Sequence, residues 1–305
     1  PPWVNHSGRC RDIEPLPPVS QIMVKSLRVT EGFFMINESD QNFMDRNKDL
    51  WNERTSIHVK SDFYKVDDFI SGRNSLSPLE MDEVGDVDGK NLLHLQCHFG
   101  LDTLSWARMG AHVTGMDYSE AAIEKAIELA ERCQLDARFI NCNLYDLPQN
   151  LLGQCDIVYT SYGVLGWLPD ISRWAQIVAS YVKPGGFFYI AEFHPFAMVF
   201  DDEAQNLQYR YPYFEKQARR YDVIGTYADR QAETKVKDEY GWDHTLADIV
   251  TSLIDNGLHL EFLHEFPYSV FQQLPILEND GNDLWRFPDG AEPIPLMFSL
   301  KAYKD

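Results

Sequence analysis

An acidic residue at the end of an expected strand is the first candidate for chemistry in this sequence. Asp117 closes the apolar segment 112–117 and lies 21 residues after Gln96, which sits at the end of the earlier apolar segment 91–97. A strand, a turn, a helix and a second strand that ends in an acid form the plan of a nucleotide-binding unit. A carboxylate in this place can accept hydrogen bonds from both hydroxyls of a ribose. The alternative is a loop acid that caps the next helix.

The turn that follows the first of these strands departs from the usual glycine-rich pattern. Before Gly100 the sequence reads Gln96, Cys97, His98 and Phe99. Glycines in such a turn allow positive φ angles and let the backbone approach a pyrophosphate closely. Their replacement therefore disfavours an NAD(P)-dependent oxidoreductase and favours a ligand that carries no phosphate.

Strands and helices alternate through the middle of the chain. The pattern predicts strands over 91–97, 112–117, 137–144, 155–162 and 186–193, and helices over 101–110, 119–133 and 169–182. Such alternation predicts a parallel sheet with helices on both faces. A helix over 245–257 and two strands over 258–268 and 295–303 complete the order. Because no helix separates these last two strands, we expect them to pair antiparallel.

Three further segments lie outside this alternation. Residues 1–44 contain adjacent prolines and predict a surface arm, whereas residues 45–80 mix aromatic and charged side chains and predict a helical lid. The α/β domain then occupies residues 81–305, with an insertion over 197–240 that is rich in tyrosine and charge. Composition leaves open whether this insertion covers one pocket or pairs two subunits as a homodimer.

The composition limits the partners of the chain. Among 305 residues, 47 acids stand against 27 bases, which gives a net charge of −20. This charge repels phosphate backbones and anionic lipids, so we expect a small-molecule partner, no nucleic acid and no membrane. No signal segment opens the sequence, and its first residue is Pro rather than Met, which indicates a trimmed chain. Five cysteines without metal-ligand spacing predict reduced thiols in a cytoplasmic protein.

The order of elements and the segment "LHLQCHFG" resemble the class I S-adenosylmethionine-dependent methyltransferases that act on small molecules. The resemblance runs over residues 91–303 and departs from the family motif at His94, which replaces an acid, and at Gln96 and His98, which replace glycines. It implies an α/β fold, with a Rossmann-like, doubly wound, seven-stranded sheet and an antiparallel C-terminal strand. It also implies S-adenosyl-L-methionine as the cofactor and in-line methyl transfer to an oxygen, nitrogen or sulfur atom of a small acceptor. A non-catalytic protein that binds the same cofactor is the alternative.

The resemblance implies a set of cofactor contacts. These are Trp51, Tyr64, Gln96, Cys97, Gly100, Asp117, Tyr118, Asn143, Leu144 and Ser161. Asp117 would bind the ribose, Tyr118 would cover the adenine, and Asn143 would reach the adenine amine. Trp51 and Tyr64 would belong to a lid that excludes water. The alternatives are a simple turn role for Asn143 and packing of the two lid aromatics against the sheet edge.

A second set of residues is expected at the acceptor. These are Trp167, Glu192, Tyr240, Trp242 and His244. His194, at the end of the fifth strand, is the candidate general base, although a His before a Pro is often a structural residue. Trp167 is equally compatible with a core position, and the last three aromatics with a hydrophobic plug under the insertion. Because no convincing set of carboxylates follows the fourth and fifth strands, we expect no metal.

Overall fold

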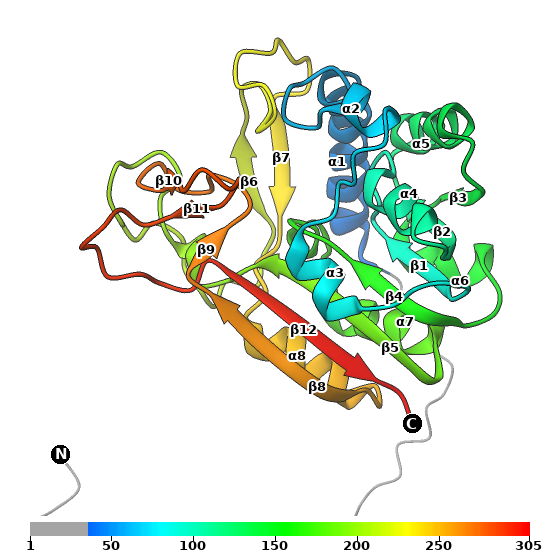
Figure 1. The fold of residues 1–305 in the computed structure, drawn as a ribbon. Helices are drawn as coiled ribbons and strands as arrows, with labels where there is room; N and C mark the ends of the chain where they lie inside the picture. Colours follow the sequence, from blue (N-terminus) through cyan, green and yellow to red (C-terminus); the bar gives the residue numbers. More distant parts are fainter. Residues whose placement is uncertain (1–35) are drawn as a thin grey trace, which may run out of the picture. The chain divides into compact units, whose positions relative to one another are not determined.

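A seven-stranded sheet forms the centre of the computed structural model, which describes residues 36–305 (Figure 1). Its strands run in the order β3-β2-β1-β4-β5-β12-β8. Their bounds are β1 Asn91–Leu95, β2 His112–Asp117, β3 Ala137–Asn141, β4 Cys155–Thr160, β5 Val182–Phe193, β8 His259–Phe266 and β12 Met297–Tyr303. The first five strands are parallel, and β12 pairs antiparallel with both β5 and β8. The predicted fold class is therefore confirmed, including the antiparallel end.

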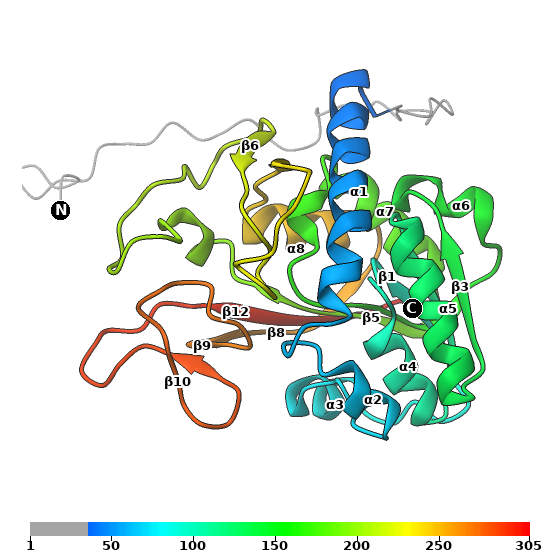
Figure 2. The same cartoon turned by 90° about the horizontal axis from the view of Figure 1, so that it is seen from above.

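Helices cover both faces of the sheet, as Figure 2 shows. They are α3 Pro78–Val84, α4 Leu101–Arg108, α5 Glu120–Cys133, α6 Leu147–Asn150, α7 Ile171–Tyr181 and α8 Leu246–Asp255. The apolar stripe of α7, with the fully buried Trp174, packs on one face with β5 and β12. Trp106 of α4 packs on the other face against β1 and β4. Burial of these stripes is the main force that orients the helices, and with them the loops at the strand ends.

Several boundaries differ from the sequence-based predictions. The helix α1 spans Glu38–His58 and begins inside the segment expected to be an arm, because the Asn37 side chain accepts a hydrogen bond from the amide of Asp40 and caps it. The remainder of the expected arm, residues 1–35, lies outside the described residues. The segment between β8 and β12 contains a small sheet, β9 Tyr268–Ser269, β10 Glu278–Asn279 and β11 Trp285–Arg286, where only a connection was expected.

The helix α1 and the insertion are joined by polar contacts. The insertion carries a hairpin of β6 Arg219–Asp222 and β7 Asp238–Gly241, and Figure 1 shows α1 beside β7. The Asn47 side chain donates to the carbonyl of Tyr240 at 2.7 Å and accepts from its amide at 2.9 Å. Arg46 and Arg54 form ion pairs with Asp238 and Glu239. These contacts join α1, which belongs to the expected lid, to the insertion, and we refer to the two segments together as the roof.

The same helix also contacts the helix that follows β2. The Asn52 Oδ1 atom accepts from the Ser119 hydroxyl at 2.7 Å and from the amide of Ala121 at 3.3 Å. Because Ser119 also caps α5, this contact joins α1 to the nucleotide-binding half of the sheet. The roof is thus fastened at two places, the insertion and the N-terminus of α5.

Two remaining expectations concern membranes and cysteines. No helix between residues 36 and 305 is long and apolar enough to cross a bilayer. The four described cysteines, Cys97, Cys133, Cys142 and Cys155, are free.

Replacement of Asn47 by Ala tests whether α1 holds the insertion in place. Each lost hydrogen bond contributes about 1 kcal/mol, so the amides of β7 should exchange with deuterium roughly tenfold to hundredfold faster. Hydrogen–deuterium exchange with mass spectrometry of the peptides over 219–241 measures this. Asn52→Ala is the matched control, because it removes the same side chain from the same helix and should accelerate exchange around residues 119–122 instead. Equal protection of β7 in the unaltered protein and in Asn47→Ala would contradict the assignment.

Candidate functional site

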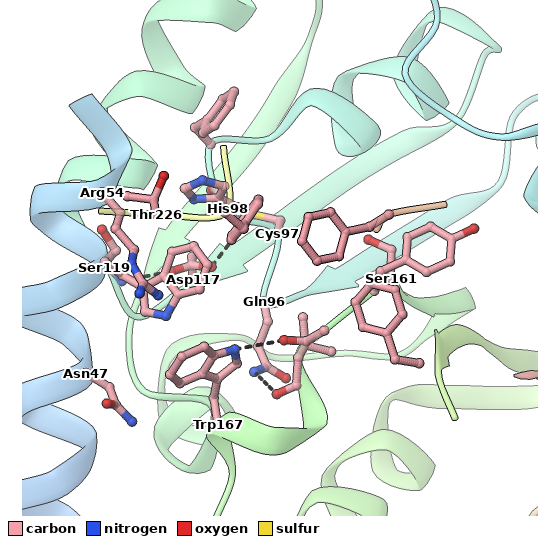
Figure 3. Close-up of a pocket in the computed structure, with 18 of the residues that line it drawn as sticks. Asn47, Arg54, Gln96, Cys97, His98, Asp117, Ser119, Ser161, Trp167 and Thr226 are labelled. Atoms are coloured by element: carbon pink, nitrogen blue, oxygen red, sulfur yellow. Dashed lines mark hydrogen bonds between the residues drawn. The ribbon is translucent and has the colours of Figure 1, made fainter. Parts of the chain in front are cut away.

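A cavity of about 880 Å³ opens at the carboxyl ends of β1, β2 and β4 (Figure 3). In Figure 3, Asn47 and Arg54 project from α1, which runs along one side of the cavity. Ligands of open parallel sheets bind at this edge, and the volume is within the usual range of about 300–1,000 Å³. All ten residues predicted from the resemblance to contact the cofactor line this cavity, as does Trp167. The structure therefore brings together residues that are spread over positions 51–161 of the sequence.

The turn between β1 and α4 keeps the backbone of a glycine-rich loop without its glycines. Gln96, His98 and Gly100 have φ angles of 55°, 51° and 80°, which is the left-handed region. Non-glycine residues in this region cost roughly 1–2 kcal/mol each and cluster at functional sites. At Gly100 no substitute fits, because a Cβ atom there would lie 2.9 Å from the ring of Phe139. The departure from the family motif therefore changes the side chains and preserves the path of the chain.

Asp117 ends β2 and holds this turn. Its carboxylate accepts from the amide of His98 at 2.8 Å and from the amide of Ser119 at 2.8 Å, as the dashed lines in Figure 3 show. Burial raises the pKa of the Asp117 carboxyl to about 6. Each carboxylate oxygen has a second lone pair, so the Asp117 carboxylate can accept hydrogen bonds from two further hydroxyl groups on the cavity side. The helix cap considered as the alternative role of Asp117 is instead supplied by Ser119, whose side chain accepts from the amide of Ala122.

The next part of the cavity lies where β3 ends. Asn143 caps the short helix η2 (Leu144–Asp146), and its Oδ1 atom accepts from the amide of Tyr145. Its Nδ2 atom lies 3.8 Å from the sulfur of Met44, which comes from α1 and also lines the cavity. Tyr118 lies in the same wall and donates its hydroxyl to Asp45. Met44 was not predicted, because nothing in the sequence places α1 over β3.

The opposite part of the cavity contains two buried carboxylates that the sequence did not reveal. Asp102 of α4 accepts from the hydroxyls of Ser75 at 2.6 Å and Ser161 at 3.2 Å. Glu80 of α3 accepts from the amide of Ser77 and from the hydroxyl of Tyr159. Burial raises the pKa of Asp102 above its ordinary value and that of Glu80 to about 7. This part of the cavity is therefore suited to a cationic group.

A histidine and an arginine complete the polar lining of the first cavity near Asp102 and Glu80. His94, which stands where the family has an acid, lies 2.8 Å from the Thr103 hydroxyl, and burial lowers its pKa to about 3. It is therefore neutral, and Asp102 and Glu80 are the carboxyl groups in this part of the cavity. Arg73 donates through Nη2 to the carbonyl of Tyr64, and its buried Nε–H has no partner. A carboxylate on a ligand would satisfy this donor.

Aromatic side chains from several segments form the remaining wall. Trp51 meets His98 and Trp167 edge to face, with ring centroids 5.1 and 5.4 Å apart. Tyr64 shares a hydrogen bond between hydroxyls with Tyr227 of the insertion. Burial lowers the pKa of His98 well below its ordinary value, so its ring is neutral. Trp51 and Tyr64 therefore face the cavity instead of only packing against the sheet edge.

Two of the residues expected at the acceptor are occupied by the protein itself. The Glu192 carboxylate accepts from the amides of Gly163, Val164, Leu165 and Phe193, so it positions the loop after β4. Glu192 also lines a second cavity. His194 lines neither of the cavities described for residues 36–305. Its Nε2 atom lies 2.8 Å from Glu265, and its Nδ1 atom accepts from the amide of Phe196. This position corresponds to the structural alternative and gives no support to a general base at His194.

The aromatic cluster after the insertion also lies away from the first cavity. Tyr240 stacks on Phe43, with ring centroids 4.1 Å apart. Trp242 is buried in the core, and the Nε2 atom of His244 lies 2.7 Å from the carbonyl of Leu168. Trp242 and His244 line a second cavity instead. Between residues 36 and 305, no group of three or more His, Cys, Asp or Glu side chains is arranged to hold a metal ion.

Comparison with known proteins relates the chain to methyltransferases. Residues 93–188 match the family model of a methyltransferase domain. A ubiquinone biosynthesis O-methyltransferase from Pseudomonas syringae pv. tomato is 31% identical over 179 residues, which cover 55% of this chain and 75% of that protein. The enzyme of the same name from Shewanella pealeana is 30% identical over 122 residues, 39% of this chain and 51% of that protein. The chain thus spans about half the length of several curated relatives that it matches.

Solved structures agree at the level of the fold. An S-adenosylmethionine-dependent methyltransferase from Mesorhizobium loti superposes with a TM-score of 0.52 and 20% identity, over 76% of this chain and 99% of that one. A putative enzyme of the same kind from Listeria monocytogenes gives a TM-score of 0.52 and 18% identity, over 74% and 96%. Together with the match to three quarters of the Pseudomonas relative, the fold shows that the chain belongs to the class I S-adenosylmethionine-dependent methyltransferases.

Proposed function

We propose that the chain binds S-adenosyl-L-methionine in the first cavity and transfers its methyl group to a small-molecule acceptor. The observation that carries the proposal is the convergence of all ten predicted cofactor residues on one cavity at the strand ends. Asp117 would accept from the ribose hydroxyls, while Tyr118, Asn143 and the Leu144 amide would meet the adenine. Asp102 would accept from the methionine ammonium, and Arg73 would donate to the methionine carboxylate. The residues present therefore offer partners to the ribose hydroxyls, to the adenine and to both charged groups of the methionine end.

The cofactor supplies a methyl group that its positive sulfur already activates, so the chain has to position and dehydrate the reactants. Trp51, Tyr64 and Tyr227 close the cavity from the lid and the insertion. Glu192 holds the loop that carries Trp167 through its hydrogen bonds to the amides at 163–165. The names of the relatives favour oxygen as the methylated atom. However, the family model matches only residues 93–188, and the lid and insertion that face the acceptor lie outside that range.

Replacement of Asp117 tests the cofactor site directly. A hydrogen bond to a charged group contributes about 1.5–3 kcal/mol, so Asp117→Asn should weaken binding of S-adenosylhomocysteine roughly tenfold to hundredfold, and Asp117→Ala at least as much. Isothermal titration calorimetry measures both. Asp156→Asn is the matched control, because Asp156 also belongs to a central strand and accepts from a backbone amide, but lies outside the cavity. Unchanged affinity in Asp117→Ala, or binding of NADH in preference to S-adenosylhomocysteine, would contradict the proposal.

The pH dependence of binding gives a second test of the same carboxylate. The ribose hydroxyls need an ionised acceptor, and burial places the pKa of Asp117 at about 6. Affinity for S-adenosylhomocysteine should therefore rise from pH 5 to pH 7 and then level off. In Asp117→Asn the rise centred near pH 6 should be absent, although Glu80, with its pKa of about 7, still titrates. Calorimetric titrations between pH 5 and pH 8 on both proteins make the comparison, and identical profiles would exclude the assigned role.

A further inference from the structure

A second cavity of about 340 Å³ adjoins the cofactor cavity on the side of the insertion. Trp167, Phe193, Met198, Phe271 and Gln273 line both cavities. These side chains form the shared wall between the two spaces. A ligand bound against this wall in the first cavity is therefore next to the second.

The side chains that line the second cavity favour an uncharged, apolar ligand. Its surface is formed largely by apolar side chains such as Phe200, Pro212, Trp242, Ile249 and Leu274. The buried charges in its wall already have partners within the protein. Glu192 accepts from four backbone amides, Asp243 pairs with Arg219 at 2.7 Å, and Glu239 pairs with Arg54 at 2.7 Å.

The two other ionisable groups of this wall do not change that conclusion. The Nε2 atom of His244 is engaged by the carbonyl of Leu168, and Asp202 is exposed to solvent. Burial of a charged ligand group here would therefore cost its hydration without a compensating partner. An apolar group would instead gain the transfer free energy of its buried surface.

One polar atom at the shared wall remains unsatisfied. The Nε2 atom of Gln273 donates to the carbonyl of Leu296 at 3.0 Å, which fixes the orientation of the amide. Its Oε1 atom is buried and has no hydrogen-bond partner. Because Gln273 lines both cavities, this oxygen can accept from an O–H or N–H group of a ligand that extends from one cavity into the other.

The charge of the first cavity limits the ligand further. Seven acidic side chains line it, against four basic ones. The acids are Glu80, Asp102, Asp117, Asp202, Glu203, Asp222 and Glu239, and the bases are Lys48, Arg54, Arg73 and Arg230. An anionic acceptor is therefore disfavoured beside the cofactor.

From these observations we propose that the second cavity binds the apolar tail of the methyl acceptor. The acceptor is an uncharged amphiphile. Its hydroxyl-bearing head lies in the first cavity and donates to the Gln273 Oε1 atom, and its hydrocarbon chain or ring fills the second cavity. This inference rests on the proposed methyl-transfer function, and it assigns to the insertion the role of selecting the acceptor.

A series of 4-n-alkylphenols with chains of one to eight carbons tests the proposal. The affinity for each phenol is measured by calorimetry with S-adenosylhomocysteine at saturation. It should rise about fourfold per methylene until the second cavity is full, because burial of one methylene contributes about 0.8 kcal/mol. The 4-n-alkylbenzoates of equal length should bind at least tenfold more weakly. Affinity that is independent of chain length, or equal for the anionic series, would overturn the proposal. Failure of the proposed function is distinguishable, because S-adenosylhomocysteine itself would then not bind.

Substitution of Gly166 locates the binding site of the tail. Gly166 lines only the second cavity, and a Cβ atom there meets its nearest neighbour, the Trp242 carbonyl, at 3.9 Å. Gly166→Leu should therefore fill the cavity and weaken binding of 4-octylphenol at least tenfold, with a small effect on 4-methylphenol. Equal losses for both phenols would contradict the assignment.

Gln273→Met tests whether the Oε1 atom of Gln273 accepts a hydrogen bond from the head of the acceptor. This variant also tests the proposal if Gly166→Leu does not fold. It should weaken binding of the alkylphenols about tenfold, while the corresponding alkylanisoles, which have no O–H donor, should bind both proteins alike. Equal effects on phenols and anisoles would show that Gln273 Oε1 accepts no hydrogen bond from the head.

Discussion

The carboxylate of Asp117 holds the turn on which the cavity depends. It joins the end of β2 to the amide of His98, so the backbone at residues 96–100 stays in a left-handed path that costs free energy at each non-glycine residue. The same carboxylate faces the cavity and has lone pairs left for a sugar. The group that holds the turn is thus also the one that we propose binds the ribose, and burial raises its pKa.

The glycine-poor motif has a second consequence for the charges of the cavity. His94 is buried and neutral where the family has an acid, and it contacts a hydroxyl on α4. The carboxyl groups in this part of the site are instead Asp102, in the first turn of α4, and Glu80 on α3. A zwitterionic amino-acid end can therefore still be bound, although the family's own residue for that task is absent.

The roof of the cavity depends on contacts between segments that are far apart in the chain. Asn47 and Arg54 of α1 bind the backbone and a side chain of β7, about 190 residues later. Because α1 also binds the N-terminus of α5 through Asn52, contacts connect the insertion to the segment that follows Asp117. The helix α1, the insertion and the turn at residues 96–100 are therefore connected to one another.

The sequence by itself determined the sheet and its antiparallel end, because these follow from local periodicity. The ten residues around the first cavity were predicted from the resemblance of the sequence to the methyltransferase family. It did not reveal Met44, Glu80, Asp102 or Gln273, since each reaches the site from a helix or loop whose position depends on packing across the sheet. It also assigned Glu192 and His194 to the acceptor, whereas the fold directs their polar atoms to backbone amides and to Glu265. Only the tertiary structure decided these points, because the side-chain partner of a residue at a strand end is set by which distant segment packs there.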